Sequence, residues 1–196
     1  FKKEYLENLG IKNTQVIGCP SIFHDSVLPK VEDNYKPKNI LLSGSFNGNW
    51  KEELKNIFEF GVKNCANYLI QSESRILFDK YKISKEELEE WNISQERINY
   101  LMNTGYDYKY YSHEDTDPKK LGNWLIDHSI FYSNFEDWIE NMKQFDMHVG
   151  VRFHGSIMST LAGVPTLTLV GDLRVQEFVD FHSLPNLQIG EFYRNI

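Results

Sequence analysis

The chain has 196 residues, a formal net charge of −7 at pH 7 and an isoelectric point near 5.4. Binding to nucleic acid or to an anionic membrane depends on clustered positive charge, and the sequence has no stripe of lysine and arginine, so we expect neither partner. No apolar run approaches the ~20 residues that span a bilayer and no secretory leader is evident, so we expect a cytoplasmic protein with no membrane span in this chain. Two cysteines, Cys19 and Cys65, are too few for a disulfide framework.

The first 38 residues predict the end of one domain and a linker. Residues 2–9 have a helical pattern and precede Gly10, a residue that commonly ends helices. The β-branched segment 14–23, TQVIGCPSIF, predicts a short strand. Residues 31–38 are charged and lack periodicity, so we expect a linker there. Because the chain begins without Met and ends without a helix stop, we expect it to be a piece of a longer protein.

A strand, a helix and a second strand follow the linker. Residues 40–42, ILL, predict a short buried strand that ends in the polar loop SGSFNGN. Apolar residues then recur at helical spacing, which predicts a helix over about 50–62 with one buried face. NYLIQ, residues 67–71, predicts the next strand, and Gln71, Ser72 and Glu73 stand at its end.

Residues 74–127 predict a helical insertion. Ser84 and Glu87 have the spacing of a capping box at the start of a helix, and apolar residues lie on one side of segment 94–103. A poorly periodic segment then carries four tyrosines, which form either a sugar-stacking platform or an ordinary packed insert. These are Tyr106, Tyr108, Tyr110 and Tyr111.

Regular alternation resumes after the insertion. Ser133 and Glu136 are expected to cap a helix that begins at Phe135. The expected strands are 128–132, 147–151 and 166–170, and the expected helices are 135–145, 154–162 and one that follows Asp172. Short apolar strands that alternate with helices are typical of right-handed βαβ crossovers. We therefore expect an α/β fold, a Rossmann-like parallel sheet with helices on both faces.

Ligands of an open parallel sheet bind in the loops after the carboxyl ends of its strands. Because all these ends share one edge, we expect the polar residues that follow the strands to converge around one cleft. These candidates are Ser43, Gly44, Ser45, Gln71, Arg152, His154, Asp172 and Arg174.

The segment VRFHGS places Arg152 and His154 where a strand becomes a helix. A helix N-terminus attracts anions, arginine offers a planar fork to carboxylate or phosphate, and histidine can transfer a proton near neutral pH. Alternatively, Arg152 forms a structural ion pair with Asp146 or Asp172, and His154 is a helix N-cap.

Three further positions also have a structural interpretation. The loop SGSFNGN could be a plain turn, Asp172 and Arg174 could form a salt-bridged helix start, and Cys19 could be a small packed residue. The histidines outside the VRFHGS segment have no metal-ligand spacing, so we predict no metal. These are His24, His113, His128, His148 and His182.

Three segments resemble the polysaccharide pyruvyl transferase family: IKNTQVIGCPSIF, ILLSGS and the stretch from residue 135 to residue 185. The last is the most specific. In it, a tryptophan-containing helix, D-x-x-V-G-x-R-x-H-G, A-G-V-P and D-x-R follow one another in the family's order. Residues 74–127 carry no signal of this family.

The resemblance implies one half of a two-domain enzyme similar to the GT-B glycosyltransferases. Residues 1–30 would then be the tail of the N-terminal domain, and residues 39–196 the Rossmann-like, donor-binding C-terminal domain. It also implies transfer of the pyruvyl group of phosphoenolpyruvate to two hydroxyls of a sugar in a cell-surface polysaccharide, giving a pyruvate ketal. Phosphoenolpyruvate would be the donor substrate, with no separate cofactor, and the polysaccharide would be the acceptor.

The family's R-x-H-G motif corresponds to Arg152, Phe153, His154 and Gly155, which would hold phosphoenolpyruvate. His154 would be the general acid that protonates the enol carbon. The family has a second donor-binding arginine in an earlier segment, for which Arg75 is the candidate by position.

Two other functions are compatible with the same pattern. A GT-B glycosyltransferase that uses a nucleotide sugar needs the same sheet edge, and Glu177 is its candidate for binding the ribose hydroxyls. A non-catalytic sugar-binding module could keep the fold with His154 in the core and Arg152 paired inside.

Overall fold

The structure is a computed structural model that describes residues 2–15, 19, 22, 31, 34–46, 50–71, 73–90, 93–103, 108, 110–114 and 117–195. Its centre is a six-stranded sheet in the order β3-β2-β1-β4-β5-β6, in which all neighbouring strands are parallel. The strands are β1 (Ile40–Ser43), β2 (Asn67–Leu69), β3 (Ser129–Ile130), β4 (Met147–Gly150), β5 (Thr166–Val170) and β6 (Asn186–Gln188). The expected α/β fold with a parallel sheet is confirmed.

The strand order contains one reversal. The chain moves outward from β1 to β2 and β3, returns to place β4 beside β1, and then moves outward again to β5 and β6. This is the doubly wound order in which ligands bind at the topological switch point, outside the carboxyl ends of the two central strands. The switch point here lies between β1 and β4.

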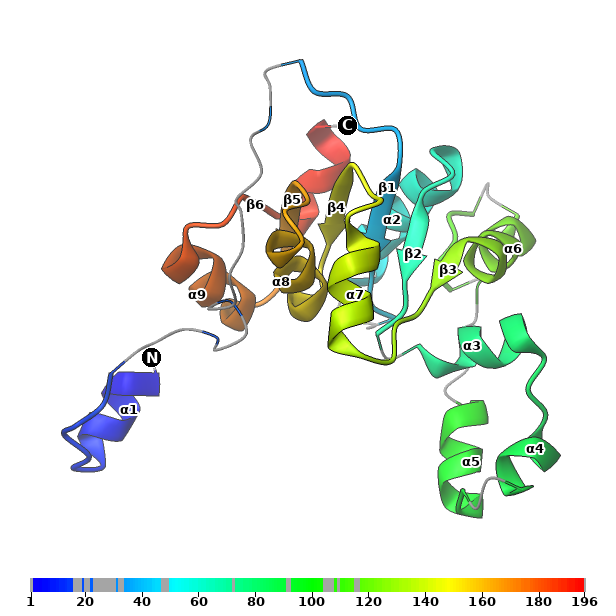
Figure 1. Ribbon diagram of the computed structural model, residues 1–196, viewed down its shortest axis with the longest axis horizontal. Helices are drawn as coiled ribbons and strands as arrows, with labels where there is room; N and C mark the ends of the chain where they lie inside the picture. The colour runs from blue at the N-terminus through cyan, green and yellow to red at the C-terminus, as the bar shows by residue number, and fades with distance from the viewer. Residues whose placement is uncertain are drawn as a thin grey trace.

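Helices cover both faces of the sheet, as expected (Figure 1). One face packs against α2 (Lys51–Lys63), α6 (Pro118–His128) and η3 (Ile189–Asn195). The other face packs against α7 (Phe135–Met142), α8 (Phe153–Leu161) and α9 (Leu173–His182).

The short strands β1 and β2 are apolar because each contributes to two cores. Leu41 and Leu69 pack with α7, α8 and α9, while Leu42 and Tyr68 pack with α2 and α6. Successive side chains of a strand point to opposite faces, so a strand covered on both faces needs apolar residues at every position. All four of these side chains are at most 1% exposed.

The insertion is helical, and its Ser84 capping box is confirmed. Glu87 accepts a hydrogen bond from the backbone N–H of Ser84 at 2.7 Å, and the Glu87 backbone N–H donates to Ser84 Oγ at 3.2 Å. The helices α3 (Ser74–Tyr81), α4 (Lys85–Glu90) and α5 (Gln95–Asn103) share a small separate core of Phe78, Leu88 and Ile98.

Helix α6, which we expected within the insertion, belongs to the sheet. It connects β2 to β3, and the indole N–H of Trp124 donates to the backbone carbonyl of Ala66, just before β2, at 2.8 Å. Leu121 and Leu125 lie in the same core as α2. The amphipathic pattern of α6 does not distinguish a crossover helix from an inserted one, because each buries a single face.

The expected cap of α7 is wrong by one residue. Asn134, not Ser133, is the N-cap, and its side chain accepts from the Asp137 backbone N–H at 2.8 Å. Since the helix begins at Phe135, the residue three positions after the true cap is Asp137 rather than Glu136. Phe135 itself is 37% exposed, so the first residue of this helix does not belong to its buried side.

Several element limits differ from the expected ones. The strand expected at 67–71 ends at Leu69, the strand expected at 128–132 is only Ser129–Ile130, and helix α7 ends at Met142. Of the strand expected at 14–23, Thr14 and Gln15 are not in a strand, and most of the rest lies outside the described residues. Apolar runs continue into loops that pack on the core, so hydrophobicity alone does not locate strand ends.

The described part of the chain before β1 holds one helix, α1 (Lys2–Asn8), which ends before Gly10 as expected. Gly10 has a φ of +83°, the left-handed conformation that favours glycine after a helix. Among the described residues, no helix has both the length and the apolar character needed to cross a membrane.

Candidate functional site

A buried polar pair, Ser43 and His148, lies at the switch point. Ser43, the last residue of β1, lies opposite Gly150 of β4, and its carbonyl accepts from the Val151 backbone N–H at 2.9 Å. Its hydroxyl is 2.9 Å from Nε2 of His148. Both side chains are fully buried, so Ser43, which we expected at a ligand, instead joins β1 to β4.

Burial lowers the pKa of His148 to about 3, because the imidazolium would lose its hydration in the core. His148 is therefore neutral at neutral pH. Its Nδ1 atom has no hydrogen-bond partner among the described residues. In the sequence, His148 is only a polar residue inside an apolar strand. Its spacing from other histidines and cysteines is not that of metal ligands, so the sequence did not identify it as a site residue.

Two glycines of the D-x-x-V-G-x-R-x-H-G segment make room for this pair. A Cβ atom on Gly150 would lie 1.9 Å from Ser43 Oγ and 2.8 Å from its carbonyl oxygen. A Cβ atom on Gly155 would lie 3.0 Å from Ser43 Oγ and 2.9 Å from Nε2 of Gln71. The spacing of the motif therefore fits the close approach of β1, β4 and the start of α8.

Replacing Gly150 with alanine is expected to lower the free energy of unfolding by at least about 1–3 kcal/mol, because the added methyl group overlaps both Ser43 Oγ and the backbone. Urea denaturation of the wild type and the variant measures the change. Gly190→Ala is the control, since a Cβ atom there has no neighbour within 4 Å. Equal losses in the two variants would contradict this account of Gly150.

Arg152 is anchored at the same place. It is the N-cap residue of α8, and its Nε donates to the Gly44 carbonyl at 3.1 Å. Its Nη2 donates to Glu73 Oε1 at 2.5 Å. The Arg152 side chain is 31% exposed, whereas the Glu73 side chain is only 2% exposed. The Gly44 carbonyl and the Glu73 carboxylate thus fix the position of the guanidinium, while part of the Arg152 side chain remains exposed to solvent.

The structural alternative for Arg152, an ion pair with Asp146 or Asp172, names the wrong partners. Asp146 accepts from the backbone N–H groups of Lys38 and Asn39, each at 2.8 Å, and so ties the segment before β1 to β4. Asp172 is the N-cap of α9. Neither pairs with Arg152, because both are used by nearby backbone donors.

Glu73 is the residue that the sequence analysis missed. It follows β2 in the loop from which we selected Gln71, and its second oxygen accepts from the Gln71 backbone N–H at 3.0 Å. Its position directly after a strand could therefore have identified Glu73 from the sequence. Its pairing with Arg152, 79 residues later in the chain, could not be predicted in this way.

His154 is the second residue of α8 and is exposed. The alternative interpretation of His154 as the helix N-cap is wrong, because Arg152 occupies the cap position. Its neighbour Phe153 packs against Phe178 of α9, with ring centroids 4.1 Å apart, and against His154 at 5.3 Å. Phe153 thus fixes the first turn of α8 on the core while His154 faces outward.

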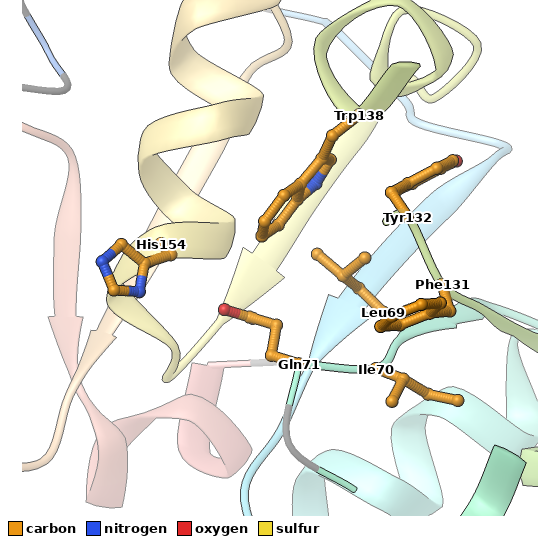
Figure 2. Close-up of a pocket in the computed structure, with 7 residues that line it drawn as sticks. All are labelled: Leu69, Ile70, Gln71, Phe131, Tyr132, Trp138 and His154. Atoms are coloured by element: carbon orange, nitrogen blue, oxygen red, sulfur yellow. The ribbon is translucent and has the colours of Figure 1, made fainter. Parts of the chain in front are cut away.

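A cavity of about 150 Å³ lies beside His154, at the carboxyl ends of β2 and β3 (Figure 2). We call it the α7–α8 cavity because Trp138 of α7 and His154 of α8 both line it. Gln71 and Tyr132 contribute to its wall, and the remaining lining side chains are aliphatic or aromatic. Figure 2 shows the Gln71 side chain extending from the end of β2 toward His154.

The other predicted site residues share the sheet edge but do not line this cavity. Gly44 is packed against Phe58 and Tyr68, and Ser45 is 8% exposed. Arg174 is exposed on the first turn of α9, at the end of β5. Arg75 forms an ion pair with Asp79 within α3. The expected convergence at one edge is found. Of the predicted residues, only Gln71 and His154 line the α7–α8 cavity, so this cavity is not the expected single cleft around all of them.

The tyrosine-rich segment is a packed insert where the structure describes it. Tyr111 is 7% exposed and meets Phe46 and Phe58 edge-on. The Tyr108 hydroxyl donates to Asp79 at 3.4 Å, and burial, followed by the Asp79 carboxylate, raises the pKa of Tyr108 to about 12. Lys51 lies 3.8 Å from the centre of the Tyr110 ring. Tyr106 lies outside the described residues.

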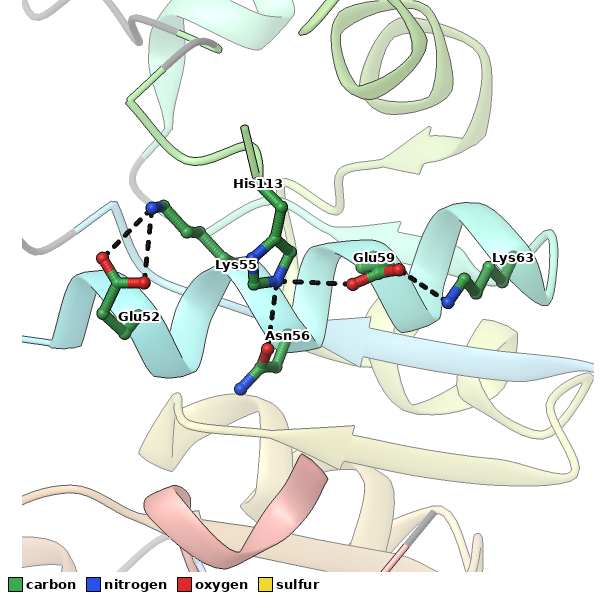
Figure 3. A network of polar contacts seen from close by, with 6 residues as sticks. All are labelled: Glu52, Lys55, Asn56, Glu59, Lys63 and His113. Carbon is green, nitrogen blue, oxygen red and sulfur yellow. Dashed lines mark hydrogen bonds and ion pairs between the residues drawn. The ribbon is translucent and has the colours of Figure 1, made fainter. Parts of the chain in front are cut away.

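Polar contacts attach this segment to α2 (Figure 3). Nε2 of His113 lies 3.1 Å from Asn56 Oδ1 and 3.3 Å from Glu59 Oε2, and Lys63 pairs with the other Glu59 oxygen at 2.6 Å. His113 is thus used in packing. Among the residues that the structure describes, no three histidine, cysteine or acidic side chains cluster in a way that could hold a metal ion.

Comparisons with known proteins agree with the resemblance noted in the sequence. The model of the family described as polysaccharide pyruvyl transferase matches residues 1–172. Comparisons with curated proteins and with solved structures each gave no match. The matched region contains β1 to β5 and all the residues of the switch point, including Ser43, Glu73, His148 and Arg152. Since the match covers well over half of its length, this chain belongs to the polysaccharide pyruvyl transferase family.

Proposed function

We propose that this chain is the donor-binding part of an enzyme that transfers the pyruvyl group of phosphoenolpyruvate to a sugar of a cell-surface polysaccharide, forming a cyclic pyruvate ketal. The observation that carries the proposal is the anchoring of Arg152. Gly44 and Glu73 hold its guanidinium at the switch point, directly before the N-terminus of α8, with about a third of the side chain exposed.

Phosphoenolpyruvate carries a carboxylate and a phosphate on the same carbon, C2, so its site needs two neighbouring sources of positive potential. The guanidinium of Arg152 is one, since its planar fork matches either group. The first turn of α8 is the other, because its leading backbone N–H groups have no partner within the helix and its dipole favours anions. Gly155 adds no side chain at the third position of this turn.

In this proposal, His154 acts on the donor carbon. In the proposed reaction its imidazolium gives a proton to the terminal methylene carbon, which becomes a methyl group, and positive charge develops on the neighbouring carbon C2. One sugar hydroxyl bonds to C2 and returns its proton to His154. A second hydroxyl then bonds to C2 as the C–O bond to phosphate breaks, and its proton leaves with inorganic phosphate.

The same proposal assigns the parts of the chain. Residues 39–196 form the donor-binding domain of a GT-B-like pair, and residues 1–30 are the tail of the other domain. The strand order reverses between β1 and β4, and this switch point is the part of the sheet edge that a facing domain would cover.

A titration of the full-length protein with phosphoenolpyruvate and, in parallel, with nucleotide sugars tests the proposal. We expect phosphoenolpyruvate to bind and the nucleotide sugars not to bind. Tight binding of a nucleotide sugar, with no binding of phosphoenolpyruvate, would favour the glycosyltransferase interpretation. Glu177, its candidate for the ribose hydroxyls, is exposed on α9.

Loss of the Arg152 side chain is expected to weaken phosphoenolpyruvate binding by about 1.5–3 kcal/mol, the usual range for a hydrogen bond to a charged group. Arg152→Ala alone would leave the buried Glu73 carboxylate without this partner. We therefore compare the donor affinity of the single variant Glu73→Gln with that of a double variant, which carries both Glu73→Gln and Arg152→Ala. Calorimetry measures both affinities. Arg97→Ala, in the insertion, is the control for a lost arginine. Equal donor affinity in the single and double variants would exclude Arg152 from the donor site.

A further inference from the structure

The buried pair of Ser43 and His148 has no step of its own in the proposed reaction. A serine that is hydrogen-bonded to a histidine is also the arrangement of a nucleophile and its base. Here both side chains are 0% exposed, so no substrate reaches the Ser43 hydroxyl. The pair can therefore act only through the residues that it holds in place.

Ser43 lies where two attachments of Arg152 meet. The Ser43 carbonyl accepts a hydrogen bond from the Val151 backbone N–H at 2.9 Å, which fixes the residue directly before Arg152. Gly44, the residue after Ser43, provides the carbonyl that accepts from Arg152 Nε at 3.1 Å. The backbone and the guanidinium of Arg152 are thus both attached to β1, at consecutive residues. A shift of Ser43 would move both attachments.

The side chain of Ser43 is itself fixed against β4. Its hydroxyl is 2.9 Å from Nε2 of His148, which stands on β4 two residues before Gly150. A Cβ atom on Gly150 would lie 1.9 Å from the same hydroxyl, so the hydroxyl fits closely against the β4 backbone. Strands β1 and β4 are only four residues long. The side-chain hydrogen bond therefore adds a connection at the end of a short ladder, directly before Gly44.

Glu73, the other partner of Arg152, is connected to the same place. One Glu73 oxygen accepts from Arg152 Nη2, and the second accepts from the Gln71 backbone N–H at 3.0 Å. The amide Nε2 of Gln71 is buried at the first turn of α8, next to Ser43 Oγ and His148 Nε2. Both groups that hold the guanidinium thus converge on the buried pair.

We propose that Ser43 and His148 are positioning residues for Arg152: their hydrogen bond fixes the Gly44 carbonyl and thereby directs the guanidinium toward the anion that it binds. An arginine side chain loses conformational freedom when it binds a ligand, and a side chain that is already held in place loses less. The inference rests on the proposed function only for the identity of the anion, phosphoenolpyruvate. The position of the guanidinium can be measured without any ligand.

Three variants separate positioning from stability. The double variant, Ser43→Ala with His148→Leu, removes both members of the hydrogen bond and leaves neither unpaired, so it should stay folded, as urea denaturation can verify. The single variant His148→Gln keeps an amide within reach of the Ser43 hydroxyl. Trp124→Phe is the matched control, because it removes a buried hydrogen bond to the Ala66 carbonyl on the other face of the sheet.

The NMR signal of the Arg152 Nε–H group, identified by its absence from Arg152→Lys, reports how firmly the guanidinium is held in the full-length protein. We expect its hydrogen exchange with water to be about 2- to 10-fold faster in the double variant than in the wild type, the factor that one net hydrogen bond contributes. Affinity for phosphoenolpyruvate, measured by calorimetry, should fall by a similar factor. His148→Gln and Trp124→Phe should both stay within about 2-fold of the wild type.

Unchanged exchange or unchanged donor affinity in the double variant would overturn the inference. So would equal effects in the double variant and Trp124→Phe, which would indicate general loosening, or in the double variant and His148→Gln, which would show that the hydrogen bond does not matter. If exchange changes as expected but phosphoenolpyruvate does not bind even the wild type, the positioning of Arg152 stands and the proposed donor is wrong.

Discussion

Replacing His154 with alanine is expected to lower the turnover of pyruvyl transfer about 100- to 10,000-fold, the usual contribution of a positioned general acid. The affinity for phosphoenolpyruvate should change much less, because Arg152 and the backbone of α8 remain. His154 is exposed and does not cap α8, so the substitution should leave the free energy of unfolding within about 0.5 kcal/mol of the wild type. Phosphate release with a suitable acceptor measures turnover, and calorimetry measures donor affinity.

His154→Asn separates proton transfer from hydrogen bonding, because asparagine keeps a donor and an acceptor but has no titratable proton. It should be as inactive as the alanine variant. His128→Ala is the matched control, since His128 ends α6 directly before β3 and therefore lies at the opposite edge of the sheet. Near-normal turnover in His154→Asn would remove the general-acid role and leave His154 as an exposed helical residue.

Below about pH 6.5, the fully buried His148 is expected to make stability depend on pH. Its pKa is about 3 in the folded protein, whereas an unperturbed histidine has a pKa near 6.5. Between these two values the unfolded chain binds a proton that the folded chain does not. The contribution of neutral His148 is therefore fully present above pH 6.5 and is lost as the pH falls, by about 1.4 kcal/mol for each pH unit.

Urea denaturation at pH 7.0, 6.0 and 4.5 tests this expectation against His148→Gln, which keeps an amide within reach of the Ser43 hydroxyl but does not titrate. Carboxylates contribute the same acid sensitivity to both proteins, so the difference between them isolates His148. Between pH 6.0 and pH 4.5, the stability of the wild type relative to the variant should fall by about 2 kcal/mol. Parallel stability curves over this range would show that the imidazole is protonated without cost.

The fold class could be predicted from the sequence because it depends on local patterns. Val175, Phe178 and Val179 mark the buried side of α9, and Leu54, Ile57 and Phe58 mark that of α2, each at helical spacing. Short apolar strands between such helices leave few arrangements other than a parallel sheet covered on both faces. The Ser84 capping box was readable for the same reason, since both of its hydrogen bonds join residues three positions apart.

The candidate site could be predicted only as a sheet edge. The rule that polar residues after parallel strands share an edge selected Gln71, Arg152 and His154 together. It could not separate side chains that face a ligand from those that join the strands to each other. Ser43 has the sequence context of a ligand-binding residue but is fully buried against His148, and Asp172 caps a helix.

By itself the sequence determined the alternation of helices and strands, the strand-to-helix turn that carries Arg152 and His154, and the motif shared with the polysaccharide pyruvyl transferase family. Tertiary structure alone decided the partners: Glu73 for Arg152, His148 for Ser43, and the side chains of β2, β3, α7 and α8 that form one cavity. Local patterns follow from the backbone geometry of a few consecutive residues. A contact between residues 79 or 105 positions apart depends instead on strand order and register, which the packing of the whole sheet fixes.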